Sequence, residues 1–408
     1  MSTDKQTTKN KIYKMDTLEI TPAREQSVLT AQSSSLAAAD RSFDQVLRQI
    51  SRPRQDIVTP MRGMQFKWDD SVGQTGRYLI ELHNKSRFEF SFPTNKYFNE
   101  QMYSRLAKGL KPYADFMQSN GQRDLLLENV NRQLQSDDRK SLVRAQENAN
   151  GLYIAKALVS DMYKPIDDDV ILDAILPMID GKDSIYKVIG GRVGMEKTHL
   201  KIVSKDPVFD IGDRPIHLGA LYINSGVGAS RFKYLLFICD AFCTNGIIFN
   251  QRTQFELSHT HKGARYSKEF GKLMGDTFKR EELRAIQSMV KETTAAALDP
   301  ARHAEFKELL EASAKRPVTG DTAEVINRLG KGIKLSALEA KLATIAIRDN
   351  EHNQYGVQAG LTRMAQELDS YDRRLEIESL AGSILTMSKE RWETIAATVK
   401  SDQVELAS

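Results

Sequence analysis

Cysteine is scarce in this chain of 408 residues, and long hydrophobic runs are missing. The two cysteines, Cys239 and Cys243, exclude a disulfide framework and suit a reducing compartment. The most apolar stretch, 234–239, is too short to span a bilayer. The first residues, MSTDKQTTKNKIYKMDTLEITPAREQ, lack the apolar segment of a signal peptide. We therefore expect a cytoplasmic protein with no membrane partner, located in the host cell cytoplasm if a phage encodes it.

A strong excess of one charge is also missing. The 58 basic and 54 acidic residues give a net charge of +4, which permits a nucleic-acid partner without requiring one. The chain is 40% hydrophobic and 27% charged, a composition that allows a sizeable core. Its length allows two domains, or one large domain with appendages.

Signatures of catalysis are absent as well. The sequence contains no Gly-x-Ser-x-Gly elbow, no Walker loop and no dinucleotide-binding fingerprint. We therefore expect no catalytic residues and no cofactor, and the leading interpretation is non-enzymatic.

The composition changes twice along the chain. Residues 1–45 are rich in Ser, Thr, Gln, Ala and Lys and poor in aromatics, which predicts a flexible arm, with a short helix over 34–50. Residues 46–265 have the pattern of a mixed α/β core, and residues 266–408 that of a helical C-terminal region. The predicted fold class is α+β, with a mixed antiparallel-sheet core.

Alternation of apolar and polar residues predicts several strands. In GRYLIELHNKSRFEFSF, two such runs at 78–82 and 87–92 flank a polar turn, which indicates a β-hairpin. The stretch 231–243 is too uniformly apolar for periodicity to separate a strand from a helix. Further strands are expected at 151–160, 186–193, 199–204, 219–224 and 245–249, and helices at 95–109 and 121–135.

The C-terminal region contains clear helix signals. Ser336 and Glu339 have the spacing of a capping box, in which each side chain bonds the other residue's backbone N–H. Gly330 and Gly332 are expected to end the preceding helix, and Pro300 marks a joint.

Three consecutive aspartates, Asp167, Asp168 and Asp169, follow the strand expected at 151–160. Carboxylates can bind Mg²⁺, and a metal-dependent nuclease built on Asp161 and Asp167 is one interpretation. The sequence PIDDDVIL is more typical of a helix start, in which Asp167 caps the helix and the next two aspartates face its positive dipole end. We expect these aspartates to be structural.

Cys239, Cys243, His259 and His261 are residue types that bind zinc. The cysteines, however, lie in the apolar run LLFICDAFCTN, where a free cysteine usually acts as a small buried hydrophobe. The two histidines would point to opposite faces of a strand. We therefore expect no metal.

Two segments could contact phosphate groups. NSGVGASR (224–231) is rich in glycine and could bind phosphate through its backbone N–H groups, but a tight turn explains it better. QRTQFELSHTHKGARYSKEFGKLMGDTFKR (251–280) places cations beside aromatics, which suits single-stranded nucleic acid, although a solvated helix face would look similar. The residues predicted to contact nucleic acid are Arg231, Lys233, Arg252, Lys262, Arg265, Tyr266 and Lys268.

Four segments resemble the phage/plasmid-like proteins grouped as domain of unknown function 932. They are LVRAQENANGLYIAKALVSDMYKPIDDDVIL, LGALYINSGVGASRFKYLLFICDAFCTNGIIF, LSHTHKGARYSKEF and NEHNQYGVQAGLTRMAQELDSYDRR. The resemblance extends over 98–385. The chain has Met162 where the family usually has Arg, and Gln358 where it favours Asn. The resemblance implies that the protein is encoded by phages or other mobile elements, and it supplies no catalytic residues.

The element Ser160-Asp161-x-Tyr163 belongs to this resemblance. We expect Ser160 and Asp161 to hold a chain reversal by side-chain hydrogen bonds and Tyr163 to pack or stack.

These features favour a DNA-binding protein of phage or plasmid DNA metabolism. Single-strand binding or annealing in recombination or replication is the preferred activity, with single-stranded DNA as the expected partner and a homo-oligomer as the expected form. The alternative is a phage-encoded interaction protein that binds a host protein, to inhibit or redirect it in anti-defence or host takeover. A metal-dependent nuclease is the third interpretation.

Overall fold

The computed structural model describes most of the chain from residue 43 onward. The described ranges are 43–69, 77–90, 101, 110–161, 163, 165–180, 184–212, 214–240, 246–248, 255–257, 276–296, 300–347, 351–368 and 370–397. The arm predicted at 1–45 and the helix predicted at 95–109 therefore lie almost wholly outside the described residues.

Six strands form the N-terminal sheet, in the order β1-β5-β6-β4-β3-β2. All neighbours are antiparallel except β4 and β6, which pair in parallel. The predicted hairpin is confirmed as β3 and β4, with Lys85 at φ 65° in its turn. The strands are β1 (Arg54–Pro60), β2 (Met64–Asp69), β3 (Arg77–Leu82), β4 (Arg87–Phe90), β5 (Lys140–Glu147) and β6 (Tyr153–Ser160), with a short 3-10 helix at Met61–Gly63.

Helices α3 (Leu110–Ser119) and α4 (Arg123–Gln135) cover one face of the N-terminal sheet. Leu126, Val130 and Leu134 recur every four residues along α4 and are buried against the sheet. Asn131 of α4 pairs with both backbone groups of Phe66, each at 2.8 Å, and so fixes the helix to β2.

The central sheet is antiparallel throughout, in the order β12-β11-β10-β8-β7, with β13 beside β11 and β9 beside β10. Its longest strand, β10, begins five residues before the predicted start at 219. The ambiguous stretch 231–243 contains strand β11. The strands are β7 (Tyr186–Val193), β8 (Thr198–Ser204), β9 (Phe209–Ile211), β10 (Arg214–Asn224), β11 (Phe232–Asp240), β12 (Gly246–Ile248) and β13 (Phe255–Leu257).

Both faces of the central sheet are covered. On one face, the side chains of Ile202, Tyr222 and Tyr234 pack against a helix formed by residues 43–50 and against α5 (Asp168–Ile179), α7 (Asp276–Ala296) and α8 (Pro300–Ala314). On the other face, residues such as Phe237 form a smaller cluster that reaches Leu375. Burial of both faces explains why β11 is apolar at almost every position.

The C-terminal helices have a core of their own, built around Trp392, whose side chain is fully buried. The predicted capping box is confirmed, because Ser336 and Glu339 bond each other's backbone N–H. The helices are α9 (Thr322–Gly330), α10 (Ala337–Ile345), α11 (Gln354–Gln366), α12 (Tyr371–Leu385) and α13 (Lys389–Ala396), with a 3-10 turn at Lys331–Ile333.

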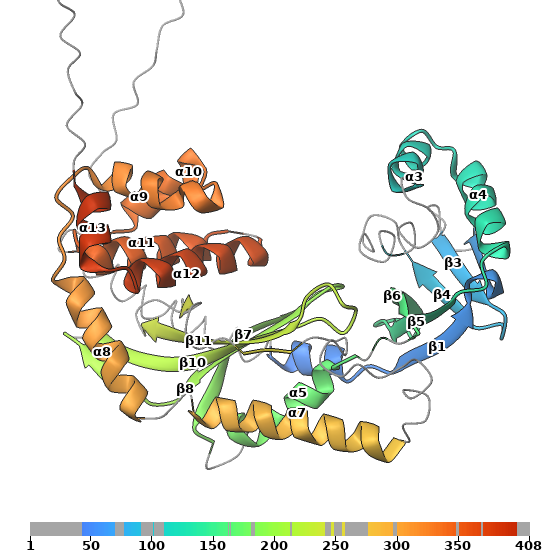
Figure 1. The fold of residues 1–408 in the computed structure, drawn as a ribbon, viewed down its shortest axis with the longest axis horizontal. Helices are drawn as coiled ribbons and strands as arrows, with labels where there is room; N and C mark the ends of the chain where they lie inside the picture. Colours follow the sequence, from blue (N-terminus) through green and yellow to red (C-terminus); the bar gives the residue numbers. More distant parts are fainter. Residues whose placement is uncertain are drawn as a thin grey trace, which may run out of the picture.

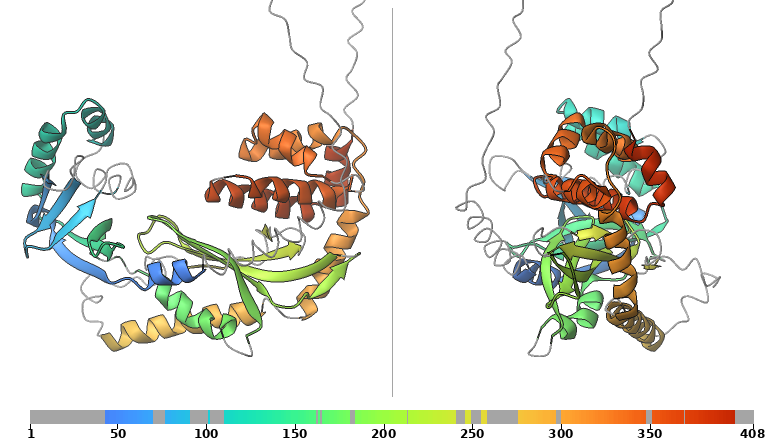
Figure 2. Two further views of the ribbon diagram at one scale, coloured as in Figure 1. Left: turned by 180° about the vertical axis from the view of Figure 1, so that it is seen from behind. Right: turned by 90° about the vertical axis from the view of Figure 1, so that its left-hand side faces the viewer.

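The described part of the chain forms an arc (Figures 1 and 2). The N-terminal sheet with α3 and α4 lies at one end, the central sheet lies in the middle, and α9 to α13 lie at the other end. The structure therefore confirms the α+β class, with sheets followed by a helical C-terminal region. No helix of the described residues is long and apolar enough to cross a membrane.

A buried ion pair holds α12 on the central sheet. Lys201 of β8 donates to both carboxylate oxygens of Glu378, at 2.6 and 2.7 Å, and the two residues are 8% and 2% exposed. A second buried carboxylate, Glu351, accepts from Arg214 of β10 and Arg363 of α11. Both carboxylates accept from a cation on a distant strand. If that cation is removed, the carboxylate stays buried with less opposite charge to balance it.

We predict that Lys201→Met lowers the free energy of unfolding by about 3–5 kcal/mol, because it leaves the Glu378 carboxylate buried without a cation. The double variant Lys201→Met/Glu378→Leu should recover most of this loss. Urea denaturation measures both changes. Lys389→Met, which breaks an exposed pair with Glu393, is the control and should change stability by less than about 1 kcal/mol. A double variant as unstable as the single one would contradict the prediction.

Candidate nucleic-acid interface

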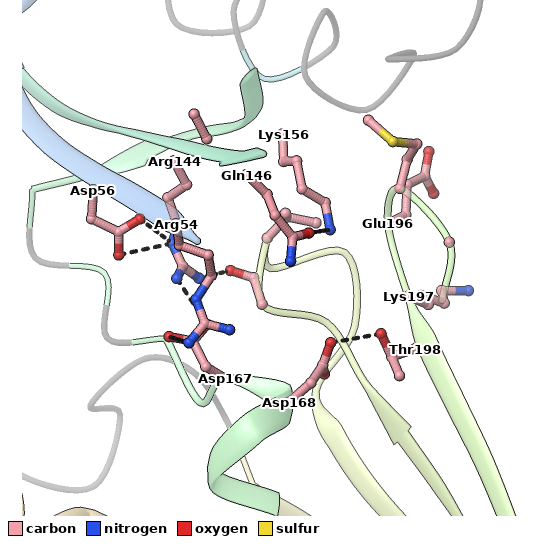
Figure 3. Close-up of a pocket in the computed structure, with 15 residues that line it drawn as sticks. Arg54, Asp56, Arg144, Gln146, Lys156, Asp167, Asp168, Glu196, Lys197 and Thr198 are labelled. Atoms are coloured by element: carbon pink, nitrogen blue, oxygen red, sulfur yellow. Dashed lines mark hydrogen bonds and ion pairs between the residues drawn. The ribbon is translucent and has the colours of Figure 1, made fainter. Parts of the chain in front are cut away.

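Arg144, on β5, is the centre of the contact between the two sheets (Figure 3). Its side chain is 6% exposed. Nε donates to the carboxylate of Asp56 on β1 at 3.0 Å, and Nη2 donates to Asp167 at 2.8 Å. Nη1 donates to the carbonyl oxygen of Gly226, in the turn between β10 and β11. One guanidinium therefore joins the N-terminal sheet, the start of α5 and the central sheet.

The environment of Arg144 keeps it charged. Burial lowers the pKa of its guanidinium, but the carboxylates of Asp167 and Asp56 raise it by more. Gly226 allows this close approach, because a Cβ there would lie 3.2 Å from Asp167 Oδ1 and 3.3 Å from Arg144 Nη1. The three groups form one packed unit.

The three aspartates begin α5, as predicted, but Asp167 does not cap the helix with its side chain. Asp167 occupies the N-cap position in an extended conformation and accepts no hydrogen bond from the helix N–H groups. Its carboxylate bonds Arg144 and lies 3.8 Å from Arg54 Nη2, while Asp169 accepts from Arg54. The capping prediction is therefore right for the helix start and wrong for this side chain, because charged donors bind a carboxylate more strongly than a neutral N–H does.

Asp168 faces the central sheet instead. Its carboxylate accepts from Thr198 Oγ1 and from Asn224 Nδ2, each at 2.7 Å. Burial raises the pKa of Asp168, and these two hydrogen bonds oppose the rise. The aspartates thus connect the start of α5 to both sheets, which is a structural role.

Two segments of the family resemblance meet at this junction. Tyr163 Oη donates to the carbonyl oxygen of Ser225 at 3.2 Å, and the tyrosine ring packs on Gly228, whose φ is +85°. The backbone N–H of Tyr163 donates to the backbone carbonyl oxygen of Ser160 at 2.9 Å, and this bond closes the chain reversal. Ser160 Oγ lies 3.5 Å from Asp161 Oδ1, a weak contact. The stretch 224–231 is the turn that the sequence favours, and Tyr163 packs as expected.

A cavity of about 40 Å³ lies beside this network (Figure 3). It can hold a water molecule or two, and it is too small for a nucleotide base. Lys156 lies at its edge and donates to Gln146 Oε1 at 3.1 Å, and burial lowers the pKa of its ammonium group. The carboxylates of Asp167 and Asp168 are already bonded, and the described residues bring together no three His, Cys, Asp or Glu side chains that could hold a metal ion.

Positive charge collects where the β7–β8 hairpin turns. Lys197 lies in that turn and lines the cavity. In the register of the central sheet, Arg192 lies opposite His199, His199 opposite Ile223, and Ile223 opposite Lys233. Directly opposite residues share a face, so Arg192 and Lys233 lie on one face, about 14 Å apart at the usual strand spacing. Arg192 is exposed and Lys233 half-buried.

His199 lies buried among these charged groups. Its pKa is lowered to about 4, mainly by burial; the carboxylate of Asp372 opposes this shift, and Lys197, Lys201 and Arg192 add to it. Its Nδ1 atom has no hydrogen-bond partner, and its Nε2 atom lies 3.8 Å from Asp372. The histidine is therefore neutral at pH 7 and surrounded by cations.

The structure describes two of the seven residues predicted to contact nucleic acid. Arg231 is exposed immediately before β11, and Lys233 lies on the row with Arg192 and opposite Glu256 of β13. The other five lie outside the described residues: Arg252, Lys262, Arg265, Tyr266 and Lys268. Of the four candidate zinc ligands, only Cys239 is described, and it is buried among apolar side chains of the central sheet, as expected.

The sequence reasoning missed Arg192 and Lys197. The signal that could have found them is the segment GGRVGMEKTHLK (190–201), in which cations flank a short turn between two predicted strands. Alternation also places His199 and Lys201 on one face of β8. Lys201 lies between Leu200 and Ile202 in this strand, and a lysine between apolar residues indicates a buried partner.

No family model, curated protein or solved structure matches this chain. The resemblance to the phage/plasmid-like proteins therefore stays a prediction from the quoted segments.

We predict that His199 makes stability depend on pH. Its pKa is about 4 in the folded chain and about 6.5 in an unfolded one, so below pH 6.5 the unfolded chain binds more protons. Folding is therefore weakened as the pH falls from about 6.5 to 4, by up to about 3 kcal/mol. Urea denaturation at about pH 7 and pH 4.5 measures this loss.

In this experiment, His199→Gln should lose about 2–3 kcal/mol less than the wild type between the two pH values. Asp168 and Glu378 are present in both proteins, so their contributions cancel when the stability loss of the variant is subtracted from that of the wild type. His352→Gln, at an exposed histidine, is the control and should follow the wild type. Equal losses in the wild type and in His199→Gln would refute the assignment.

Proposed function

We propose that this protein binds single-stranded DNA and acts in strand binding or annealing in phage or plasmid DNA metabolism. The observation that carries the proposal is the group of cations at the hairpin end of the central sheet: Arg192, Lys197, Arg231 and Lys233. We call this group the cationic row.

The cationic row has the geometry that a flexible polyanion requires. Lysine and arginine side chains bind phosphate groups without reading sequence, and they supply most of the affinity for single strands. Arg192 and Arg231 are exposed, so they can reach phosphates without first breaking the core. Acidic groups also lie in this region: Asp372 is 3.9 Å from Lys197 Nζ with a 69% exposed side chain, Glu196 precedes Lys197 in the turn, and Glu256 lies opposite Lys233.

The buried and half-buried cations near the cationic row are neutralised by carboxylates of the same chain. Lys201 lies on the same face of β8 as His199, but Glu378 neutralises it, so it contributes little to an external anion. Arg144 and Arg54 are likewise held by Asp56, Asp167 and Asp169. These paired cations hold the fold, whereas Arg192 and Arg231 of the cationic row are exposed at the surface.

The predicted residues of the basic-aromatic segment extend the proposal. Arg265 and Lys268 would add phosphate contacts, and Tyr266 would stack on a base. The resemblance to phage/plasmid-like proteins supports a role in mobile-element DNA. The small junction cavity and the occupied carboxylates give no comparable support to a nuclease.

Charge reversal in the cationic row should weaken binding to a labelled single-stranded oligonucleotide. We expect Arg192→Glu/Lys197→Glu and Arg231→Glu/Lys233→Glu each to lower the affinity at least tenfold at low salt. The plot of log affinity against log salt should flatten by about 0.7 for each phosphate group that the variant no longer neutralises. Fluorescence anisotropy across a salt series measures both quantities.

The matched control is Lys389→Glu/Arg391→Glu on α13, which changes the net charge equally at exposed residues. It should bind almost as the wild type does. Thermal unfolding checks that each variant is folded. Equal weakening in all three double variants would mean that only net charge matters, and no binding by the wild type at low salt would remove the proposal in favour of an interaction protein.

A further inference from the structure

One helix of the C-terminal region presents an apolar face to solvent. Leu338, Leu342 and Ile345 of α10 are 67%, 36% and 60% exposed. Their spacing of four and three residues places them on one side of the helix. Ala340 and Ala343, on the other side, are buried in the C-terminal core. We call the three exposed residues the α10 face.

Three more apolar side chains are exposed on the helical hairpin of α3 and α4, two of them one turn apart on α3 and the third on α4. Tyr113, Phe116 and Leu125 are 43%, 59% and 47% exposed. Their neighbours Met117 and Leu126 point the other way, into the core of the N-terminal sheet. We call the exposed three the hairpin face. Nine large hydrophobic side chains are exposed among the described residues, and these two faces hold six of them.

Helix α10 and the hairpin of α3 and α4 lie at opposite ends of the arc (Figures 1 and 2). We propose that they bind each other between copies, so that the α10 face of one copy packs on the hairpin face of the next. Because the two faces differ, the contact is head-to-tail, and each added copy presents a fresh face. A dimer in which one of the two faces packs on its own copy would leave the other face exposed to water.

Charge complementarity favours this pairing over two like faces. Lys341 lies in the α10 face, three residues after Leu338 and four before Ile345, and Lys331 and Lys334 are exposed nearby. Glu128 lies one helical turn after Leu125 in the hairpin face, with a 54% exposed side chain. Its ion pair with Arg132 is exposed and worth a few tenths of a kcal/mol, so Glu128 is available to a second cation.

The contact is small, which sets its strength. Three large apolar side chains on each side fall short of the roughly 800 Å² per partner of a standard stable interface. The assembly should therefore be concentration-dependent, with single copies when dilute. In the absence of nucleic acid, the number of copies in the assembly then depends on the protein concentration.

Sedimentation velocity of the full chain without nucleic acid, over a wide concentration range, tests the proposal. The wild-type mass should rise with concentration beyond that of a dimer. Leu338→Glu and Phe116→Glu should each remain monomeric. An equimolar mixture of the two variants should form dimers and nothing larger, because the mixture contains one intact pair of faces and no second. Ile185→Glu, at another exposed apolar residue (52%), is the control and should assemble as the wild type does.

A charge swap tests the pairing directly. Lys341→Glu and Glu128→Lys should each weaken assembly, and the two changes in one chain should restore it, since opposite charges again face each other. A wild type that is monomeric at every concentration would overturn the proposal. So would an assembly that stops at the dimer and is insensitive to one of the two Glu substitutions. Neither result bears on DNA binding, which the salt series measures separately.

Discussion

The structure depends on one buried guanidinium. Arg144 contacts β1, the start of α5 and the turn after β10 at the same time, and its side chain is 6% exposed. A buried arginine is stable only while its donors are matched by acceptors. Its three partners must therefore keep their relative positions, and with them the N-terminal sheet, α5 and the central sheet. Gly226 is part of the same constraint, since a side chain there would push against the ion pair.

A second buried charge performs the same task at the other end. Lys201 and Glu378 fix α12 against β8, and Tyr371 and Asp372 at the start of α12 then lie against His199. Both anchors use their charges inside the protein. Arg192 of the β7–β8 hairpin and Arg231 before β11, by contrast, are exposed at the surface. That arrangement can present a fixed set of positive charges to a flexible polyanion, as we propose.

Local signals in the sequence predicted local structure well. The alternation in 77–90 predicted β3 and β4, and the spacing of Ser336 and Glu339 predicted the start of α10. Strand β11 stayed ambiguous because the central sheet is buried on both faces, so its apolar residues carry no period. Partners distant in the sequence could not be predicted. Asp167 was expected to cap its own helix, and nothing local indicates that Arg144 takes that carboxylate.

The same limit applies to the candidate interface. The sequence indicated Arg231 and Lys233 as cations after a turn, but the alignment of Lys233 with Arg192 exists only through the register of four strands. Hydrogen exchange of the backbone amides, with and without a single-stranded oligonucleotide, is the sharpest test of DNA binding at the cationic row. We predict slower exchange in 192–199 and 224–233 when the oligonucleotide is bound, and no change in α13. Unchanged exchange in both segments under saturating oligonucleotide would contradict this assignment.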